Sequence, residues 1–231
     1  MFDLSPAEIE AVLLSLKVSL WAVGVSLPLG IATAWVLARL EFPGETLLDA
    51  LIHVPLVVPP VVVGYLLLLL LGRNGYVGGW LYETFGITVA FSWQGAAVAA
   101  AVMAFPLMVR AIRLSIEAID TRLEQAARTL GARPIDVFFS ITLPLTGSGI
   151  VVGVILAFAR ALGEFGATIT FVSAIPGETT TLPVSLYTLA QIPGEESGAI
   201  RLVVLSLIVA FGAMFAAEII ARRVRKRIAG T

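Results

Sequence analysis

Five apolar stretches, each about as long as a bilayer is thick, constrain the fold of this chain more than any other feature of its sequence. They run from Ala11 to Leu40, Leu51 to Leu71, Gln94 to Ile116, Leu143 to Leu162 and Leu202 to Ala221. A helix that spans a membrane needs about 20 mostly apolar residues. Only 13% of the 231 residues are charged, whereas about a quarter are charged in a soluble domain. We therefore predict an all-α polytopic membrane protein with five transmembrane helices in one domain, residues 1–231.

The composition excludes several classes of function. A net charge of −1 leaves no basic surplus to attract nucleic acid. The chain has no cysteine and a single histidine, His53, so thiol catalysis and a multi-histidine metal site are excluded. Neither Lys17 nor Lys226 lies in a GxxxxGK(S/T) sequence, so the chain has no P-loop. We expect no enzyme activity, no metal and no cofactor on this chain; if ATP–Mg drives it, a separate subunit binds the nucleotide.

Arginine and lysine predict how the five helices are oriented. Eleven of the 15 basic residues fall on one side of a five-span arrangement and four on the other. Because cytoplasmic segments carry an excess of basic residues, we predict an outside N-terminus and a cytoplasmic C-terminus. The eleven are Arg39, Arg110, Arg113, Arg122, Arg128, Arg133, Arg222, Arg223, Arg225, Lys226 and Arg227, and the four are Lys17, Arg73, Arg160 and Arg201.

Some segments depart from a regular membrane helix. Pro59 and Pro60 interrupt the second stretch, since proline lacks the N–H group that a helix needs. Irregular backbone in a membrane must be satisfied by protein or water, so the residues before Pro59 either face the interior of the bundle or form a kinked packing helix. The run from Phe165 to Ile175 is too short to span; it either re-enters the membrane or extends the fourth helix. Gly149 and Gly153, four residues apart, indicate tight helix packing.

Arg160 and Glu164 are a charged pair at the predicted outer end of the fourth stretch. Their spacing of four residues allows an ion pair on one helix. Charges in membrane helices are costly and usually face the interior of a bundle. Two interpretations remain open: an ion pair that fixes the wall of the bundle, or an arginine that helps an anion to enter. With Pro59 and Pro60, these two residues are our candidates for the pathway or its gate.

For residues 120–144, the longest predicted cytoplasmic segment, the sequence predicts two short helices. Thr121 and Glu124 match a capping box that would begin the first helix. Gly131 stands where a left-handed glycine would end it, and Pro134 where a first-turn proline would begin the second. Asp136 would then lie in the first turn of the second helix, where a carboxylate suits the helix dipole. Both helices carry apolar side chains, which would be buried either under the bundle or against a soluble partner.

The residues of this segment also resemble a known motif. Glu124, Ala126, Ala127 and Gly131, followed by Ile141-x-Leu143-Pro144, match the EAA loop of bacterial ABC importer permeases in residue type and spacing. The resemblance extends over residues 42–68, 85–120 and 158–183, which look like the molybdate permeases of this group.

This resemblance implies a transport complex in the bacterial cytoplasmic membrane. Two copies of the chain would form the pathway, two separate ATP-binding subunits would bind below, and a periplasmic or lipid-anchored binding protein would deliver molybdate above. The binding protein would contact residues 72–90 and 173–200, the sizeable outer segments. The residues carried over as the coupling site are Glu124, Ala126, Ala127, Gly131, Pro134, Asp136, Val137 and Phe138.

Other substrates and other functional classes are alternatives to a molybdate permease. Sulfate, thiosulfate or tungstate are alternative substrates, because the substrate assignment rests on overall resemblance. A stand-alone channel or ion-coupled carrier would more often show internal repeats and ionisable residues at the membrane midplane, and neither is evident here. An intramembrane enzyme would need a nucleophile and base or metal ligands, and His53 has no acidic companions on an obvious shared face. We also expect no regulatory domain appended to this chain.

Overall fold

The fold was analysed in a computed structural model that describes residues 4–228, with side chains as far as Arg223. Within this range the chain is helical and contains no strand. In chain order the helices are α1 (Pro6–Arg39), α2 (Glu45–Val57), α3 (Pro60–Leu71), α4 (Tyr76–Phe85), α5 (Trp93–Glu117), α6 (Thr121–Thr129), α7 (Pro134–Val137), a π-helical turn η1 (Phe138–Thr142), α8 (Leu143–Leu145), α9 (Gly147–Leu162), α10 (Gly166–Val172), α11 (Leu182–Leu189) and α12 (Glu196–Ile228).

The structure confirms the all-α membrane fold. Three helices, α1, α5 and α12, are long and apolar enough to cross a bilayer on their own. Two bent pairs raise the number of spans to as many as five: α2 with α3, bent by 116°, and the run Pro134–Leu145 with α9, bent by 67°. The second and fourth predicted spans are therefore broken helices rather than straight ones.

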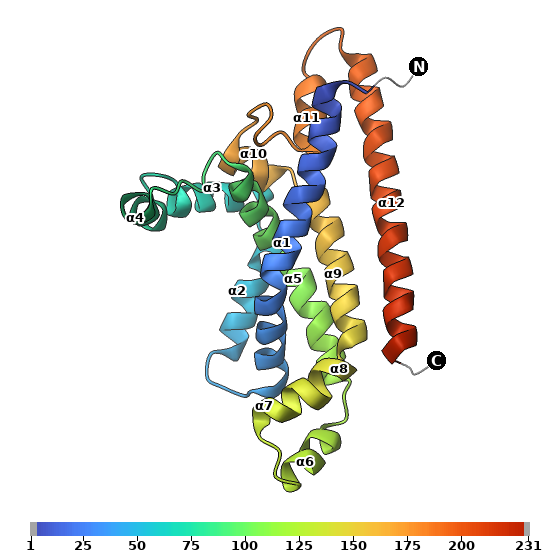
Figure 1. Ribbon diagram of the computed structural model, residues 1–231. Coiled ribbons are helices and arrows are strands. Elements are labelled where there is room, and N and C mark those ends of the chain that lie inside the picture. Colours follow the sequence, from blue (N-terminus) through green and yellow to red (C-terminus); the bar gives the residue numbers. More distant parts are fainter. Residues whose placement is uncertain (1–3, 229–231) are drawn as a thin grey trace.

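Helix α5 lies at the centre of the bundle between α1 and α9 (Figure 1). Three of its alanines, Ala96, Ala99 and Ala100, are fully buried, because small side chains let neighbouring backbones approach closely. Gly149 and Gly153 of α9 contribute in the same way from the opposite helix, and a Cβ atom at Gly153 would lie 3.1 Å from the Met108 carbonyl oxygen. The predicted role of these two glycines in packing is confirmed.

The break in the second span falls at the prolines. Pro55 lies inside α2 without ending it, whereas Pro59 is the N-cap of α3 and Pro60 its first residue. Helix α3 then runs sideways, and α3 and α4 form an arm that projects from the bundle (Figure 1). None of the α2 side chains is buried in the chain, and Val57 is 86% exposed. Leu48 and Ile52 of α2 nevertheless pack against the core as partly buried side chains. Of the two interpretations left open for this segment, the single chain agrees with the kinked packing helix.

Residues 165–175 form neither a continuation of the fourth helix nor a span. The chain breaks at Gly163–Phe165 and resumes as the short helix α10, which packs against α3. The contact is very close: a Cβ atom at Gly64 would lie 2.5 Å from the Ala167 carbonyl oxygen, and one at Gly166 would lie 2.8 Å from Pro60 Cβ. The two irregular segments of the sequence therefore stabilise each other.

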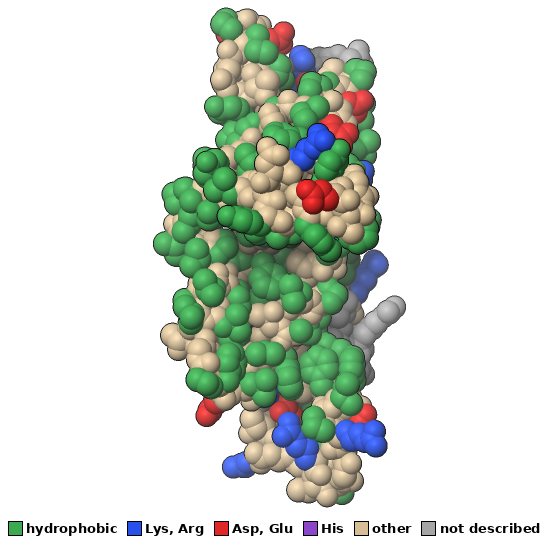
Figure 2. Space-filling model, turned by 90° about the vertical axis from the view of Figure 1, so that its left-hand side faces the viewer, with side chains coloured by type: hydrophobic (Ala, Val, Ile, Leu, Met, Phe, Trp, Pro, Cys, Tyr) green, Lys and Arg blue, Asp and Glu red, His purple; other side chains and the backbone are tan. Residues whose placement is uncertain are grey.

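The two ends of the bundle differ. Helices α6 to α8 lie at one end, here called the loop end, together with the C-terminal end of α12 (Figure 1). Figure 2 shows a broad apolar band between the two ends, with acidic and basic side chains at both of them. The basic residues Arg225, Lys226 and Arg227 fall on α12 beyond the described side chains.

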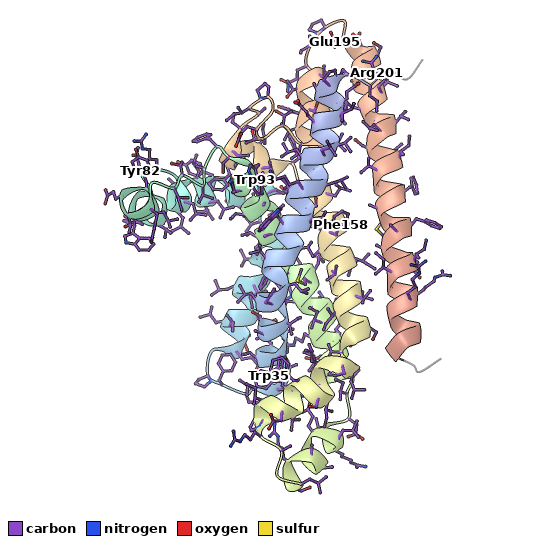
Figure 3. All side chains as sticks on the ribbon, in the orientation of Figure 1. Trp35, Tyr82, Trp93, Phe158, Glu195 and Arg201 are labelled. Atoms are coloured by element: carbon purple, nitrogen blue, oxygen red, sulfur yellow. The ribbon has the colours of Figure 1, made fainter. Side chains whose placement is uncertain are left out.

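Polar contacts hold the opposite end together. The buried Glu8 carboxylate of α1 accepts a hydrogen bond from Arg201 Nε of α12 at 3.1 Å. Lys17 Nζ lies 3.6 Å from the centre of the Trp93 ring, which links α1 to the start of α5 (Figure 3). Ser15 Oγ, also buried, accepts a 2.7 Å hydrogen bond from the Leu182 N–H at the start of α11. Long-range polar contacts thus fix α1 against α5, α11 and α12.

Enlarging Gly149 should destabilise the bundle, because a Cβ atom there would collide with Ser115 Cβ of α5. We expect Gly149→Val to lower the free energy of unfolding by about 1–3 kcal/mol, the usual cost of overpacking. Gly24→Val is the matched control, since a Cβ atom at Gly24 has no heavy atom within 4 Å. Thermal unfolding midpoints of both purified variants in one detergent test this; equal midpoints would contradict it.

Candidate coupling site

Helix α6 begins one residue earlier than the capping-box interpretation requires. Its N-cap is Asp120, whose carboxylate accepts a hydrogen bond from the Arg122 N–H at 2.9 Å. Thr121 is the first helical residue, and its side chain caps nothing in the structure. The predicted capping box between Thr121 and Glu124 is therefore wrong: the Asp120 side chain meets the need of the first turn, which leaves Glu124 free to point elsewhere.

Glu124 points into the protein and joins four segments. It is 6% exposed, and its two carboxylate oxygens accept hydrogen bonds from Arg39 Nε at 3.2 and 3.1 Å. Thr142 Oγ1, in the π-helical turn, donates to the same carboxylate at 2.8 Å. Arg39 Nη2 also donates to the Ile116 carbonyl oxygen at 2.9 Å. One buried carboxylate thus connects α6 to the end of α1, to η1 and, through Arg39, to the end of α5.

Arg39 and Thr142 are site residues that the sequence analysis did not identify. The sequence identifies Arg39 only as a charge that orients the first span. It is separated from Glu124 by 85 residues, so no local spacing relates the two. One feature of the sequence relates the two residues. Arg39 is the last residue of a membrane helix, and Glu124 lies in a later segment on the same predicted side of the membrane.

The turn between the two short helices has the predicted geometry. Gly131 has φ +91°, in the left-handed region that glycine adopts without steric cost. The Ala132 N–H donates to the Ala127 carbonyl at 3.1 Å and the Gly131 N–H to the Arg128 carbonyl at 3.0 Å. This pair of hydrogen bonds is a Schellman motif, which satisfies the last carbonyl groups of α6.

The second helix also begins as predicted, but it is longer. Pro134 is its first residue, and the Asp136 carboxylate accepts a hydrogen bond from the Arg133 N–H at 3.2 Å. The helix continues through η1 and α8 to Leu145, where it meets α9 at the 67° bend. The two-helix loop therefore leads directly into the fourth span.

The apolar side chains of this helix divide between two faces. Val137 is 3% exposed, and the Phe138 ring packs edge-on against Trp35 of α1 at 5.8 Å. Ile135 and Phe139 instead lie on the outer face, with 63% and 59% of their surfaces exposed. Within the segment from Pro134 to Phe139, Val137 and Phe138 therefore face their own bundle in the single chain and Ile135 and Phe139 face outward, because residues four apart share a face of a helix and their neighbours do not.

The first helix adds further exposed residues to this outer face. Leu123 is 50% and Leu130 is 89% exposed. Ala126 is also exposed, whereas Ala127 is half-buried. An apolar groove of about 480 Å³ separates Ile135 and Phe139 from the end of α1. The loop end of the chain therefore exposes several large apolar side chains, beside an apolar groove, and exposed apolar surface of this kind is typical of protein interaction sites.

The candidate pathway residues lie at the break between α9 and α10. Arg160 Nη1 lies 2.5 Å from the Glu164 carboxylate, so the i,i+4 ion pair is formed. Glu164 is 3% exposed, and its other oxygen accepts a hydrogen bond from the Ala167 N–H at 2.8 Å. The pair therefore holds the start of α10 against the end of α9. Pro60 packs against Gly166 at this same place, whereas Pro59 is exposed.

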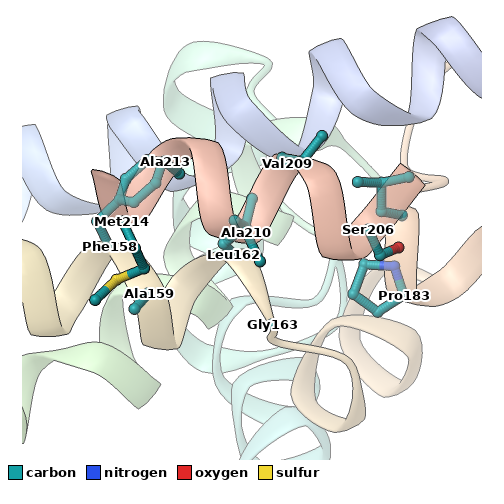
Figure 4. A pocket seen from close by; sticks show the side chains of 11 residues that line it. Phe158, Ala159, Leu162, Gly163, Pro183, Ser206, Val209, Ala210, Ala213 and Met214 are labelled. Atoms are coloured by element: carbon teal, nitrogen blue, oxygen red, sulfur yellow. The ribbon is translucent and has the colours of Figure 1, made fainter. Parts of the chain in front are cut away.

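The structure offers little for a metal or cofactor. Among the described residues, no group of three His, Asp or Glu side chains is placed to hold a metal ion. A cavity of about 200 Å³ lies between α9, α11 and α12 (Figure 4). Its lining is almost entirely apolar, with Phe158, Leu162 and Met214 among the larger side chains and Ser206 as the single hydroxyl.

Comparison with known proteins defines the class. A chain of a bacterial alginate ABC transporter, solved in complex with an alginate pentasaccharide-bound periplasmic protein, superposes with a TM-score of 0.76. It is 19% identical and covers 96% of this chain and 81% of its own length, so the shared property is the fold of an ABC transporter membrane subunit. The family model for binding-protein-dependent transport system inner membrane components matches residues 26–226, and the chain belongs to this family.

Two relatives are much more similar in sequence. The molybdenum transport system permease protein ModB of Escherichia coli (strain K12) is 63% identical over 97% of this chain and 98% of its own length. The protein of the same name from Haemophilus influenzae (strain ATCC 51907 / DSM 11121 / KW20 / Rd) is 52% identical, over 96% of each chain. Both are named as transport permeases.

Removing one partner of the Glu124–Arg39 pair should detach α6 from the bundle. Breaking a buried ion pair typically costs about 3–5 kcal/mol, since the remaining charge is left unpaired. We expect Glu124→Ala to accelerate tryptic cleavage after Arg128 at least tenfold. Glu117→Ala is the control, because the Glu117 pair with Arg113 is 40% exposed on its acidic side and exposed pairs contribute only about 0–1 kcal/mol.

The double variant Arg39→Met with Glu124→Met separates this effect from simple loss of volume. Replacing both charges by apolar groups removes the unpaired charge, so it should restore most of the protection from trypsin. If Glu124→Ala is cleaved no faster than Glu117→Ala, Glu124 does not hold the loop in place.

Proposed function

We propose that this chain is the membrane-spanning permease subunit of an ATP-driven ABC importer, and that the ion it carries inward is molybdate. The observation that supports this best is the 63% identity to the ModB relative over 97% of the chain. That identity extends over the membrane helices as well as the loop, so it includes the segments that line a pathway.

In this proposal the chain itself hydrolyses no ATP. A P-loop needs a lysine that reaches the β/γ phosphates, and Lys17 and Lys226 do not occur in such a motif. Two copies of the chain form the pathway, and two separate subunits bind ATP–Mg at the loop end. The exposed apolar side chains Leu130, Ile135 and Phe139 are the surface that these subunits cover.

Movement of an ATP-binding subunit would reach the membrane helices by two routes. The first is the Glu124–Arg39 pair, which connects α6 to the end of α1. The second is the helix from Pro134 to Leu145, which leads into α9 at the bend. Helix α9 ends at the break where Arg160 pairs with Glu164 and α10 begins, and α10 packs against α3. A displacement of the loop would therefore change the position of both broken helices.

The loop end is cytoplasmic in this proposal, and the end with the N-terminus faces outward. The outer segments 72–90 and 173–200 would then receive the binding protein. Glu178, Glu195 and Glu196 are exposed in the second of these, which would favour a basic surface on that partner. Figure 3 shows the place of Glu195 near the end of the bundle opposite the loop end.

Uptake by the reconstituted complex tests the substrate. Proteoliposomes that contain this chain and its ATP-binding subunit should accumulate labelled molybdate when ATP and the binding protein are supplied. A tenfold excess of sulfate should leave the initial rate nearly unchanged. If sulfate abolishes molybdate uptake and is itself transported, the sulfate alternative is favoured over our proposal.

Variants of the loop test the coupling. Gly131→Val forces a side chain into the left-handed region, which misplaces the second helix without touching any span. Ile135→Asp together with Phe139→Asp places charges on the exposed apolar surface. We expect both variants to insert normally and to lose most co-purification of the ATP-binding subunit and most uptake. Ser140→Asp, an exposed position on the same helix, is the control, and equal co-purification in all three would contradict the assignment.

Accessibility of introduced cysteines tests the orientation. The chain has no natural cysteine, so each variant carries a single thiol. Leu4→Cys should react with a membrane-impermeant reagent in intact cells, whereas Leu130→Cys, 89% exposed at the loop end, should react only after the membrane is opened. The opposite pattern would reverse the proposed topology.

A further inference from the structure

A groove of about 630 Å³ lies along the open face of the bundle between α5 and α9. Its apolar lining consists mainly of Leu107, Leu114, Val152 and Leu156. Three polar side chains also line it: Arg110 and Ser115 from α5, and Ser148 from α9. No carboxylate lines the groove.

Arg110 differs from most of the other described arginines of the long helices. It is exposed, and among the described residues its guanidinium group forms no hydrogen bond or ion pair. Arg223, near the C-terminal end of α12, is likewise exposed and unpaired within the described residues. The other five described arginines of these helices are paired: Arg39 with Glu124, Arg113 with Asp49, Arg160 with Glu164, Arg201 with Glu8, and Arg222 with Glu218. The serine hydroxyls of the groove are likewise without a hydrogen bond in this part of the chain. Arg110 therefore carries a positive charge that the described residues do not neutralise.

The position of Arg110 along helix α5 indicates the kind of environment that its charge faces. It lies inside the apolar helix α5, seven residues before the end of that helix at Glu117. An unpaired charge within a membrane helix is costly against lipid and normally faces a protein interior or a water-filled cavity. The groove is therefore better explained as part of an aqueous space than as a lipid-facing surface.

The chemistry of the groove fits an anion. A guanidinium group offers up to five N–H donors in a planar fork, and each serine adds one O–H donor. A tetrahedral oxyanion presents several acceptor oxygens, and the absence of a lining carboxylate removes the repulsion that would exclude it. By contrast, the charge of Arg160 is already balanced by Glu164, and the cavity of Figure 4 is lined by apolar groups.

The groove also lies at a suitable place along the bundle. Helix α5 begins near α10, which contacts both α3 and α5, and it ends beside α6 at the loop end. Arg110 therefore lies between the broken helices α3 and α10 and the loop end. An ion that has passed the breaks would meet Arg110 before it leaves the bundle.

We propose that Arg110, with Ser115 and Ser148, forms a transient site for a tetrahedral oxyanion between the broken helices and the loop end. This inference deepens the proposed function and rests on it for the identity of the ion. The site attracts the anion into an otherwise apolar groove, and binding is weak because few groups contact the ion.

The electrostatic part of the proposal can be tested without transport. Ser148→Cys in the complete complex is treated with an anionic and a cationic thiosulfonate reagent of similar size. With Arg110 present, the anionic reagent should react faster; in Arg110→Gln its advantage over the cationic reagent should fall about tenfold, equivalent to about 1.4 kcal/mol of Coulomb energy. No reaction with either reagent, or an unchanged ratio, would overturn the site.

The transport part uses the reconstituted complex with its binding protein. Arg110→Gln should lower the initial rate of molybdate uptake about tenfold, while Arg110→Lys, which keeps the charge, should retain at least a third of it. Ser148→Ala should lower the rate about threefold. Ser26→Ala is its control, since Ser26 donates only to carbonyl groups of its own helix, and should leave the rate unchanged. Normal uptake by Arg110→Gln in an assembled complex would overturn the site.

The two measurements also separate this inference from the proposed function. If the unaltered complex transports another oxyanion in place of molybdate but the reagent ratio and uptake still depend on Arg110, the proposed substrate is wrong and the site stands. If molybdate is transported and neither measurement depends on Arg110, the site is wrong and the proposed function stands.

Discussion

A break in a helix within a bilayer leaves backbone N–H and carbonyl groups where no water can reach them, and each unsatisfied group costs free energy. This chain meets the constraint in two ways. At Pro59–Pro60 the break falls where two residues carry no N–H group, and the Val62 N–H donates to the Pro59 carbonyl at 2.9 Å. At the other break the buried Glu164 carboxylate accepts the Ala167 N–H. Both breaks are therefore tolerated by local chemistry.

The pairing of the two breaks follows from the same constraint. Helices α3 and α10 are too short to cross a membrane alone, and each buries its irregular start against the other through Gly64 and Gly166. The α1–α5–α9 core beneath them is made rigid by alanine and glycine contacts. The bundle thus combines a closely packed core with two broken helices that pack against each other.

Much of this organisation is predictable from the sequence, because it depends on neighbours along the chain. The apolar stretches, the glycine turn at Gly131, the proline that begins the second loop helix and the Arg160–Glu164 pair all follow from local spacing. The partner of Glu124 does not, since Arg39 lies 85 residues away. The sequence likewise identifies Arg110 only as a basic residue that orients the protein in the membrane. The groove beside Arg110 is visible only in the structure.

Errors in the prediction have a similar cause. The capping box failed because Asp120 competes with Thr121 for the first turn, and only the burial of Glu124 decides between them. The family resemblance implies that the segment from Pro134 to Phe139 docks a partner, but it does not say which side chains point outward. In the structure Val137 is buried and Phe138 packs against Trp35, because a short helix against a membrane protein has an inner apolar face as well as an outer one.

The π-helical turn η1 has a consequence for the length of the loop. The Leu143 N–H donates to the Phe138 carbonyl five residues earlier, so this turn holds one residue more than an α-helix would. Because the extra residue is taken up within this wide turn, the helix before it stays close to the register that it would have without that residue. A residue inserted into or deleted from the regular α-helical part of this segment would instead rotate everything before it by about 100° relative to α9, and Glu124 would then no longer meet Arg39. Outside η1, the number of residues between Glu124 and α9 is therefore constrained independently of their identity.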